Sequence, residues 1–371
     1  MCTSLLYVDA MNRPYVGRTL ELSLELPYLI ARFPKKKALT SSVSGYPSID
    51  YTLKHAILAV TMPSELPTTA GFEPQGLKVI EGVNDVGLTF SVQSYPQAGG
   101  SQPDLKNDYP TLSILDLGTF LLGQCATIQE VKSLLSDLQI VLEHVPILGG
   151  VQMPFHYSVH DATGASLVIE FHHGVRTVYD NPVGVMTNAP QFSWHLTNLN
   201  NYTFLSNVDH SRGRFMGYDV MQPGSGTAKT GLPGTDSSVD RFIRAVYYAQ
   251  FAEKQTDADK SVQMVAHIMN NFDRPRGITI DPPEQGSAHL EVVGQKLDAA
   301  IPTEFTSWTS ITDIERRRLY VRDSAGMNYL CLDLAAQADA TNFAVVPLRK
   351  LAPPVTDLTA QLANSEAKPN P

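Results

Sequence analysis

The chain begins with MCTSLLYVDAMNRPYVGRTLEL at residues 1–22, two apolar runs separated by a polar turn. Each run has the composition of a short strand, and the Asn-Arg-Pro turn at 12–14 predicts a hairpin between them. Such a hairpin would lay Arg18 and Glu21 beside Cys2. This stretch decides the fold, because it ties the second residue of the chain to a pair of strands.

Cys2 directly follows Met1, and methionine aminopeptidases remove an initiator methionine when the next residue is as small as cysteine. Removal would leave one residue with both a thiol and a free α-amine. An α-amine titrates near ~7.7–8.0 and a thiol near ~8.5, so at neutral pH the amine can accept the thiol proton and activate the sulfur. The alternative is that Cys2 is a chance residue at a frayed terminus.

A cysteine that attacks an amide also needs a cation to favour its thiolate, a group to orient the amine, and donors for the oxyanion. Arg18 and Glu21 have the chemistry for the first two tasks. The alternative for this pair is an ordinary exposed pair of opposite charges.

The composition limits the class of partner. The 371 residues are 43% hydrophobic and 18% charged, which is typical of a globular protein. The net charge of −9 argues against nucleic acid or an anionic membrane surface as a partner. No apolar run approaches the ~20 residues that cross a bilayer, so we expect no membrane insertion.

The three cysteines, Cys2, Cys125 and Cys331, cannot all pair and lack metal-ligand spacing. We therefore expect no metal, and we expect Cys125 and Cys331 to be buried as small hydrophobic residues. No secretory signal follows Met1. We expect a cytoplasmic protein if Met1 is the native start, and a periplasmic one if a signal peptide has been removed.

Strand-like runs and helical patterns alternate in blocks, which predicts an α+β protein with antiparallel sheets covered by helices. Apolar periodicity predicts helices at 128–143, 239–253 and 258–271. Short apolar runs predict strands at 4–8, 16–20, 28–33, 56–62, 77–81, 87–92, 155–160, 166–171, 175–179, 183–187, 307–312, 318–322 and 328–332. We expect one domain over 2–350 and a proline-rich, extended or disordered tail over 351–371.

Several segments together resemble one family. Met-Cys-Thr at 1–3 and Gly-Arg-Thr-Leu-Glu at 17–21 are similar to the choloylglycine hydrolases, the Ntn-hydrolase family of bile salt hydrolases and penicillin V acylases. The order and spacing of the similar segments hold from residue 2 to roughly 330. The resemblance implies a four-layer αββα sandwich with two stacked antiparallel sheets. The further similar segments are EGVNDVGL at 81–88, MTNAPQF at 186–192 with its continuation to 202, and the loop and helix start at 231–242.

The resemblance also implies roles. Cys2 would be the nucleophile and, through its own amine, the general acid and base. Arg18 would stabilise the thiolate, Asn188 would donate to the oxyanion, and Arg241 would complete the charged network. Glu21 would hold the amine. From the residues alone, Asn188 has a second interpretation, as a turn residue shortly before a proline.

Two positions depart from the family pattern. Family members usually carry aspartate followed by an aromatic residue where this chain has Glu21 and Leu22. The second oxyanion donor aligns with Ser94, or with Tyr95 if the alignment slips by one. The extra methylene of glutamate moves the carboxylate by over ~1 Å, enough to affect a catalytic arrangement. The residues expected to form the acyl pocket are Leu22, Leu24, Phe72 and Tyr95.

The resemblance implies an enzyme without a cofactor that hydrolyses a linear carboxamide with an apolar acyl group. Penicillin V acylase-like activity is the first expectation, with conjugated bile salts and N-acyl homoserine lactones as alternatives. Glu21 and Ser94 leave open another class of function, a weakly active or inactive relative that binds acyl amides. The partner would be a small-molecule acyl amide. The resemblance also implies a homo-oligomer, since relatives are commonly tetramers.

Overall fold

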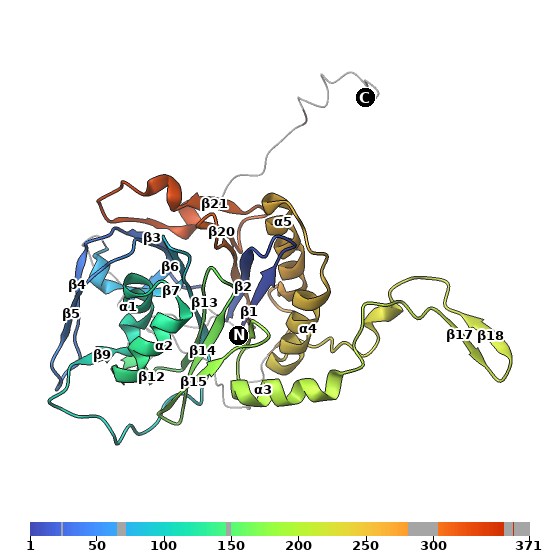
Figure 1. Ribbon diagram of the computed structural model, residues 1–371, viewed down its shortest axis with the longest axis horizontal. Helices are drawn as coiled ribbons and strands as arrows, with labels where there is room; N and C mark the ends of the chain where they lie inside the picture. Colours follow the sequence, from blue (N-terminus) through green and yellow to red (C-terminus); the bar gives the residue numbers. More distant parts are fainter. Residues whose placement is uncertain (24, 65–71, 146–149, 281–302, 352–358, 360–371) are drawn as a thin grey trace.

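The first two strands, β1 (Cys2–Val8) and β2 (Pro14–Leu22), form the predicted antiparallel hairpin. In their register Cys2 lies opposite Leu20, and Ser4 lies opposite Arg18. This computed structural model describes residues 1–371 except 24, 65–71, 146–149, 281–302, 352–358 and 360–371 (Figure 1). Leu24 therefore lies outside the described residues, as does the predicted tail apart from residues 351 and 359.

The hairpin is central to a six-stranded antiparallel sheet, so that Cys2 begins an interior strand. The order in this sheet is β16 (Val185–Met186), β1, β2, β19 (Phe305–Asp313), β20 (Arg318–Asp323) and β21 (Leu330–Asp333). β19 pairs with β2 with a register shift between Thr306 and Trp308.

A second antiparallel sheet faces the first. Its order is β15 (Val175–Asp180), β14 (Ser166–His172), β13 (Phe155–His160), β8 (Thr89–Ser94), β7 (Leu77–Asn84), β6 (Ile57–Pro63), β3 (Leu29–Phe33) and β22 (Ala344–Pro347). The main core includes the space between the two sheets, where Leu20 and Trp308 pack among apolar side chains of the second sheet.

Helices cover the outer face of each sheet, as Figure 1 shows. α1 (Leu117–Gln124) packs on β7 and β8, and α2 (Ile128–Asp137) adds Val131 and Leu135 to the main core. α4 (Ser238–Phe251) and α5 (Ala258–Met269) cover β1 and β2 on the opposite side. Two sheets between two helical layers confirm the predicted α+β, αββα class.

Local sequence explains where the helices begin. The hydroxyl of Thr127 accepts a hydrogen bond from the Glu130 N–H and caps α2, as its capping-box pattern predicts. Ser237 caps α4 in the same way, through the Asp240 N–H.

Several predictions were wrong in detail. The helix predicted over 128–143 ends at Asp137, because the chain turns extended at Leu138 and forms β10 (Gln139–Val141) with β9 (Thr111–Ser113). Two short helices were missed, α1 and α3 (Phe192–Asn198). α1 is buried almost all round, so it has no amphipathic stripe to reveal it. Cys331 is exposed rather than buried, because its strand lies at a sheet edge.

The remaining strands form small pairs outside the two large sheets. These are β4 (Ala38–Ser41) with β5 (Ile49–Thr52), β11 (His144–Val145) with β12 (Val151–Gln152), and β17 (Arg212–Phe215) with β18 (Tyr218–Met221). The β17–β18 hairpin stands away from the rest of the molecule in Figure 1. In the described part of the chain, no helix has both the length and the apolar character to cross a membrane.

Candidate active site

Cys2 lies at the start of β1, on the face that looks toward the second sheet, and its side chain is buried. A buried strand, and not a frayed terminus, therefore positions the sulfur. The Cys2 N–H donates to Asn188 Oδ1 at 2.8 Å. Its carbonyl accepts from the guanidinium of Arg241. Both backbone groups of Cys2 are thus fixed by side chains from distant parts of the sequence.

Arg18 lies beside the sulfur and is fully buried. Its Nη2 is 3.7 Å from Cys2 Sγ, and the same nitrogen donates to the Val92 carbonyl. The guanidinium lies 4.6 Å from the centre of the Trp308 ring, a cation–π contact that holds it in plane. The pair of Arg18 and Glu21 is buried on both members, so the interpretation as an exposed charge pair was wrong.

A further carboxylate lies behind Arg18. Glu81 Oε2 is 3.5 Å from Arg18 Nε, and neither side chain is exposed. Burial raises the pKa of Glu81 to about 7, while the positive charge of Arg18 acts in the opposite direction. Arg18 therefore has the sulfur on one side and an ionisable carboxyl on the other.

Asn188 joins three parts of the site. Its Oδ1 accepts from the Cys2 N–H and, at 2.7 Å, from Arg241 Nη2, so the orientation of the amide is fixed by two donors. Its Nδ2 consequently faces the Ser94 carbonyl, to which it donates at 2.8 Å. A primary amide has two N–H hydrogens, and this contact uses one of them. The other is available to a substrate oxygen.

Arg241, on α4, connects the helical layer to the site. Besides Cys2 and Asn188, it donates to Thr3 Oγ1 at 2.7 Å and to the Asp236 carbonyl at 2.9 Å. Burial lowers the pKa of Arg241, and the negative charge of Glu21 opposes this effect.

Glu21 is buried at the end of β2, next to the amino terminus. Its carbonyl accepts from the Met1 amine at 2.6 Å, and its Oε1 accepts weakly from Thr306 Oγ1 at 3.4 Å. Burial raises the pKa of the Glu21 carboxyl, and the charges of Arg241 and the terminal amine counteract it. Among the described residues, Glu21 Oε2 has no hydrogen-bond partner.

Buried histidines hold the segment that contains Asn188. His195 Nε2 bonds the Asn188 carbonyl at 2.9 Å, and its ring stacks on Phe242. His156 bonds the preceding carbonyl, of Thr187, at 3.1 Å. Burial lowers the pKa of His195 to about 4, so its ring is neutral at neutral pH. The two histidines thus hold the backbone of residues 187 and 188 in place through their hydrogen bonds. Within the described ranges, no three His, Cys, Asp or Glu residues are grouped to hold a metal ion.

A small apolar pocket opens at the sulfur. The described residues enclose about 40 Å³ there, lined by Cys2, Leu20, Glu21, Leu22, Leu26, Tyr28, Met62, Ile80, Val92, Ser94 and Phe155. Of the four residues expected to form an acyl pocket, Leu22 lines it, and Leu24 lies outside the described residues.

Tyr95 and Phe72 do not line this pocket. Tyr95 follows Ser94 at the end of β8, so strand alternation sends the two side chains to opposite sides. The ring of Tyr95 stacks on His156, and its hydroxyl bonds His172 at 2.7 Å. Phe72 packs at the edge of the main core. Ser94 is therefore the residue of the pair that lies at the sulfur.

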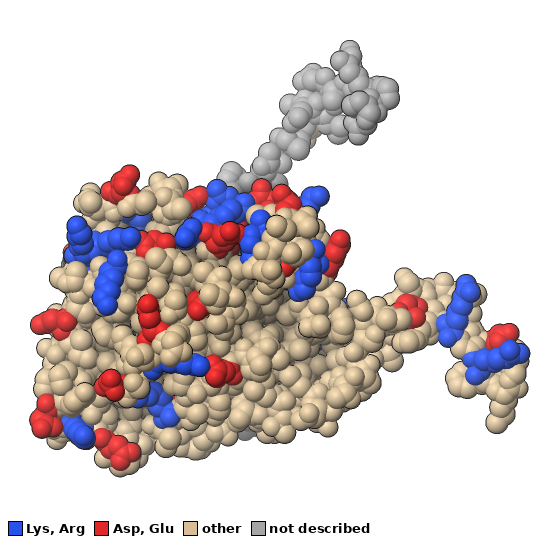
Figure 2. Space-filling model, viewed as in Figure 1, with Lys and Arg blue, Asp and Glu red and all other residues tan. Residues whose placement is uncertain are grey.

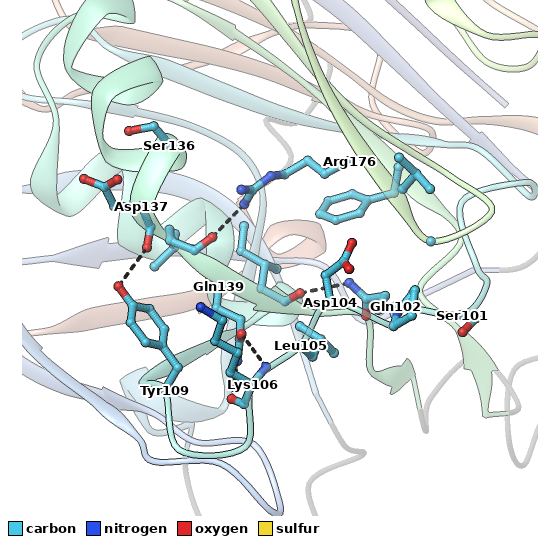
Figure 3. A pocket seen from close by; sticks show the side chains of 16 residues that line it. Ser101, Gln102, Asp104, Leu105, Lys106, Tyr109, Ser136, Asp137, Gln139 and Arg176 are labelled. Atoms are coloured by element: carbon cyan, nitrogen blue, oxygen red, sulfur yellow. Dashed lines mark hydrogen bonds between the residues drawn. The ribbon is translucent and has the colours of Figure 1, made fainter.

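A larger hollow of about 580 Å³ lies elsewhere, between the loop at 101–109, the end of α2 and the β14–β15 turn (Figure 3). Two of its polar side chains bond backbone carbonyls of its own wall. Arg176 donates to the Leu138 carbonyl, and Tyr109 donates to the Asp137 carbonyl. Cys2 does not line it, so we do not regard it as the reaction site.

Sequence reasoning missed Glu81 and the histidines as parts of the site. One signal was available for Glu81, since a lone carboxylate in the apolar strand run 77–83 has to find a buried partner. His156 and His195 carry no comparable signal, because the contacts that tie them to the site are to the backbone carbonyls of Thr187 and Asn188.

Comparisons with known proteins agree with this geometry. Residues 2–337 match the family described as linear amide C–N hydrolases, choloylglycine hydrolase family. A bile salt hydrolase/transferase of Lactiplantibacillus plantarum is 27% identical over 94% of this chain and 97% of its own length. A penicillin V acylase of Pectobacterium atrosepticum is 24% identical over 90% of this chain and 81% of its own.

Among solved structures, a mutant conjugated bile acid hydrolase from Clostridium perfringens has the same fold, with a TM-score of 0.73 at 22% identity over 93% of this chain and 96% of the other. The family match covers all strands of the two large sheets except β22, the α-helices named above and every described residue around Cys2. The chain therefore belongs to the choloylglycine hydrolase family, and it is a hydrolase of linear amide C–N bonds.

Proposed function

We propose that the mature protein begins at Cys2 and uses this residue as both nucleophile and base to cleave amides with a compact apolar acyl group. Penicillin V is the first substrate class. The observation that supports this most is the convergence on Cys2 of Arg18 at the sulfur and Asn188 at the nitrogen, with an apolar pocket beside them.

In the first half of the reaction, the α-amine takes the proton of Cys2 Sγ, and the sulfur attacks the carbonyl carbon. The charge that develops on the carbonyl oxygen is stabilised by the free hydrogen of Asn188 Nδ2, a type of contact that lowers a barrier by ~3–4 kcal/mol. The ammonium then gives its proton to the leaving nitrogen, the C–N bond breaks, and a thioester remains on Cys2.

In the second half, water gives a proton to the α-amine and attacks the thioester. The acyl group leaves as a carboxylic acid, and the sulfur regains its proton from the ammonium. Arg18 favours the anionic form of the sulfur in both halves.

The amine needs acceptors that orient it. Asn188 Oδ1 already accepts a hydrogen bond from the Cys2 nitrogen. Glu21 Oε2, at the end of β2, is a buried acceptor that has no hydrogen-bond partner among the described residues. Once Met1 is removed, we expect the ammonium to use both. Glutamate can therefore serve in place of the family's aspartate.

The lining of the pocket supports the substrate class. Tyr28 and Phe155 provide aromatic walls, and Leu22, Met62 and Ile80 provide aliphatic ones, while Ser94 is polar. Aromatic and aliphatic walls favour an uncharged, flat acyl group such as phenoxyacetyl. Conjugated bile salts are a second candidate, because the relatives of that name align over most of the chain.

The test compares amine release from penicillin V, glycocholate and a long-chain acyl homoserine lactone, using mature protein and Cys2→Ala. We expect turnover of penicillin V that disappears in the variant. Cleavage of glycocholate alone would show that conjugated bile salts, and not penicillin V, are the substrate class, and it would leave the proposed mechanism unchanged. Binding without any turnover would favour the inactive acyl-amide-binding relative.

The β17–β18 hairpin supports the expected homo-oligomer. It stands apart from the body in Figures 1 and 2. The hairpin exposes the large apolar side chains of Phe215, Met216, Tyr218 and Met221, and the segment that leads into it exposes those of Phe204 and Val208. An isolated two-stranded hairpin is only marginally stable in water. We propose that a second copy of the chain covers it in a tetramer. Light scattering on the purified protein tests this, and a monomer at micromolar concentration would contradict it.

A further inference from the structure

We propose that Glu81 is a positioning residue that acts through Arg18: it competes with the Cys2 sulfur for one positive charge, and its protonation favours the thiolate. This inference rests on the proposed use of Cys2 as nucleophile, and goes beyond it by adding a buried proton-binding group to the site.

The geometry places three groups in a row. Arg18 Nη2 is 3.7 Å from Cys2 Sγ, and Arg18 Nε is 3.5 Å from Glu81 Oε2. All three side chains are buried, so water does not screen the charges. The guanidinium is fixed from two further directions by the Val92 carbonyl and the Trp308 ring. It cannot turn away from one neighbour without losing these contacts.

An irregularity in β7 aims Glu81 at this position. In the pairing with β6, Glu81 lies opposite Val60 and Val79 lies opposite Thr61, which leaves Ile80 as an extra residue. Such a bulge redirects side chains and is frequent next to active sites. Here Ile80 lines the apolar pocket while Glu81 contacts Arg18 across the space between the sheets.

Few other charges act on Glu81. Arg18 of β2 is the charged group that faces it, and Ser91 lies opposite it on β8. Around the sulfur the neighbouring ionisable groups are the α-amine of Cys2 itself in the mature protein, Arg18 and Glu21 of β2, Arg241 of α4 and Tyr28, which precedes β3. Of all these groups, only Arg18 touches both the sulfur and Glu81.

The charges then balance in two ways. With Glu81 ionised and Cys2 as thiol, the group formed by Arg18, Glu81 and Cys2 has no net charge. With Glu81 protonated and Cys2 as thiolate, it is again neutral, and the two states differ by the position of one proton. Both groups ionised would leave a buried net charge of −1, and both protonated would leave +1. Like charges that share a site oppose each other's ionisation, so the two protons are bound with coupled affinities.

Neutral Glu81 is a populated state at neutral pH. Its pKa of about 7, raised by burial, means that both forms are present near pH 7. Removing the carboxylate should therefore free Arg18 for the sulfur at every pH.

The experiment follows the rate of Cys2 carbamoylmethylation by iodoacetamide against pH, by mass spectrometry of the N-terminal peptide. Mature protein, Glu81→Gln and Glu81→Asp are compared. In Glu81→Gln we expect the pH midpoint of Cys2 alkylation to fall by about one unit, which is the interaction above which two sites titrate as a coupled pair. At a pH one unit below the wild-type midpoint, alkylation should then become roughly fivefold faster. Glu81→Asp keeps the charge and should retain the wild-type midpoint.

Two controls separate this effect from structural damage. Glu143→Gln removes another carboxyl with a raised pKa, one paired with Ser113, and should leave the midpoint unchanged. Exposed Cys331 reacts in the same molecules and should show an unaltered profile. An unchanged or higher midpoint for Cys2 in Glu81→Gln would overturn the proposal, since a purely structural partner of Arg18 would weaken its support of the thiolate.

The wild-type protein provides a second measurement if Glu81→Gln does not fold. Alkylation makes the sulfur permanently neutral, so the carboxyl should remain ionised to lower pH. Infrared titration should show a protonated-carboxyl band whose midpoint falls by about one unit after alkylation, as reciprocal linkage requires. An unshifted carboxyl titration would refute the coupling. Neither readout needs a substrate, so failure of the coupling is distinguishable from failure of the proposed hydrolysis.

Discussion

The amide of Asn188 offers the sharpest test of how the site treats the substrate carbonyl. Asn188→Asp keeps the size and the Oδ1 acceptor used by Cys2 N–H and Arg241, but it removes both Nδ2 hydrogens. Loss of one oxyanion donor costs ~2.7–4 kcal/mol of barrier, so we expect kcat to fall by a factor of about 10²–10³. The assay is release of free amine from penicillin V at saturating substrate.

The same change also affects stability, and the structure indicates how much. The Ser94 carbonyl, which accepts from Nδ2 at 2.8 Å, would lose its donor at a cost of ~1–3 kcal/mol. The new carboxylate would meet Arg241 and recover part of this loss.

Asn84→Asp is the matched control for Asn188→Asp. Its Nδ2 also donates to buried carbonyls, those of Leu122 and Cys125 at 2.8 Å, yet it has no described contact with Cys2. We expect Asn84→Asp to lose stability and keep kcat. If Asn188→Asp folds and retains kcat within about threefold of wild type, Asn188 is not the oxyanion donor.

Three more predictions concern pH, packing and the second donor. Burial lowers the pKa of His160 to about 4, so the neutral ring contributes its full stability above pH ~6.5, and this contribution is lost as the pH falls through 4. Urea unfolding above pH ~6.5 and below pH ~4 measures the free energy of unfolding that the protein loses on acidification, and His160→Leu should make this loss smaller by about 3 kcal/mol. An equal loss in both proteins would contradict this. Gly17→Ala would place Cβ 2.6 Å from Met269 Sδ and should cost about 1–3 kcal/mol of unfolding free energy without altering Cys2 alkylation; unchanged stability would show that α5 shifts freely. Ser94→Ala should lower kcat about 3–10-fold if the hydroxyl donates to the oxyanion, and an unaltered kcat would exclude it.

Much of the architecture could be predicted from local patterns. The hairpin of β1 and β2, the capped start of α2 and the paired helices α4 and α5 follow from apolar periodicity and capping residues. The end of α2 at Asp137 could not, because the apolar residues beyond it continue the helical period, and the pairing of β10 with β9 overrides that local preference.

The site shows the same division. Cys2, Arg18 and Asn188 were found from chemistry and resemblance, and the structure brings them together. The pocket was predicted less well. Tyr95 points away from the sulfur because side chains alternate along β8, and the register of a strand cannot be read to one residue from composition. Glu81 depends on a bulge that only the pairing with β6 reveals.

The central claim is that the amine of Cys2, free of Met1, is the base that activates its own sulfur. The most direct measurement compares turnover by two purified preparations, one with Met1 removed and one with Met1 retained by inhibiting methionine aminopeptidase during expression, each verified by intact mass. The account predicts amide hydrolysis only in the chain that begins at Cys2. Equal turnover by the protein that retains Met1 would contradict it, because an acylated nitrogen cannot accept the thiol proton.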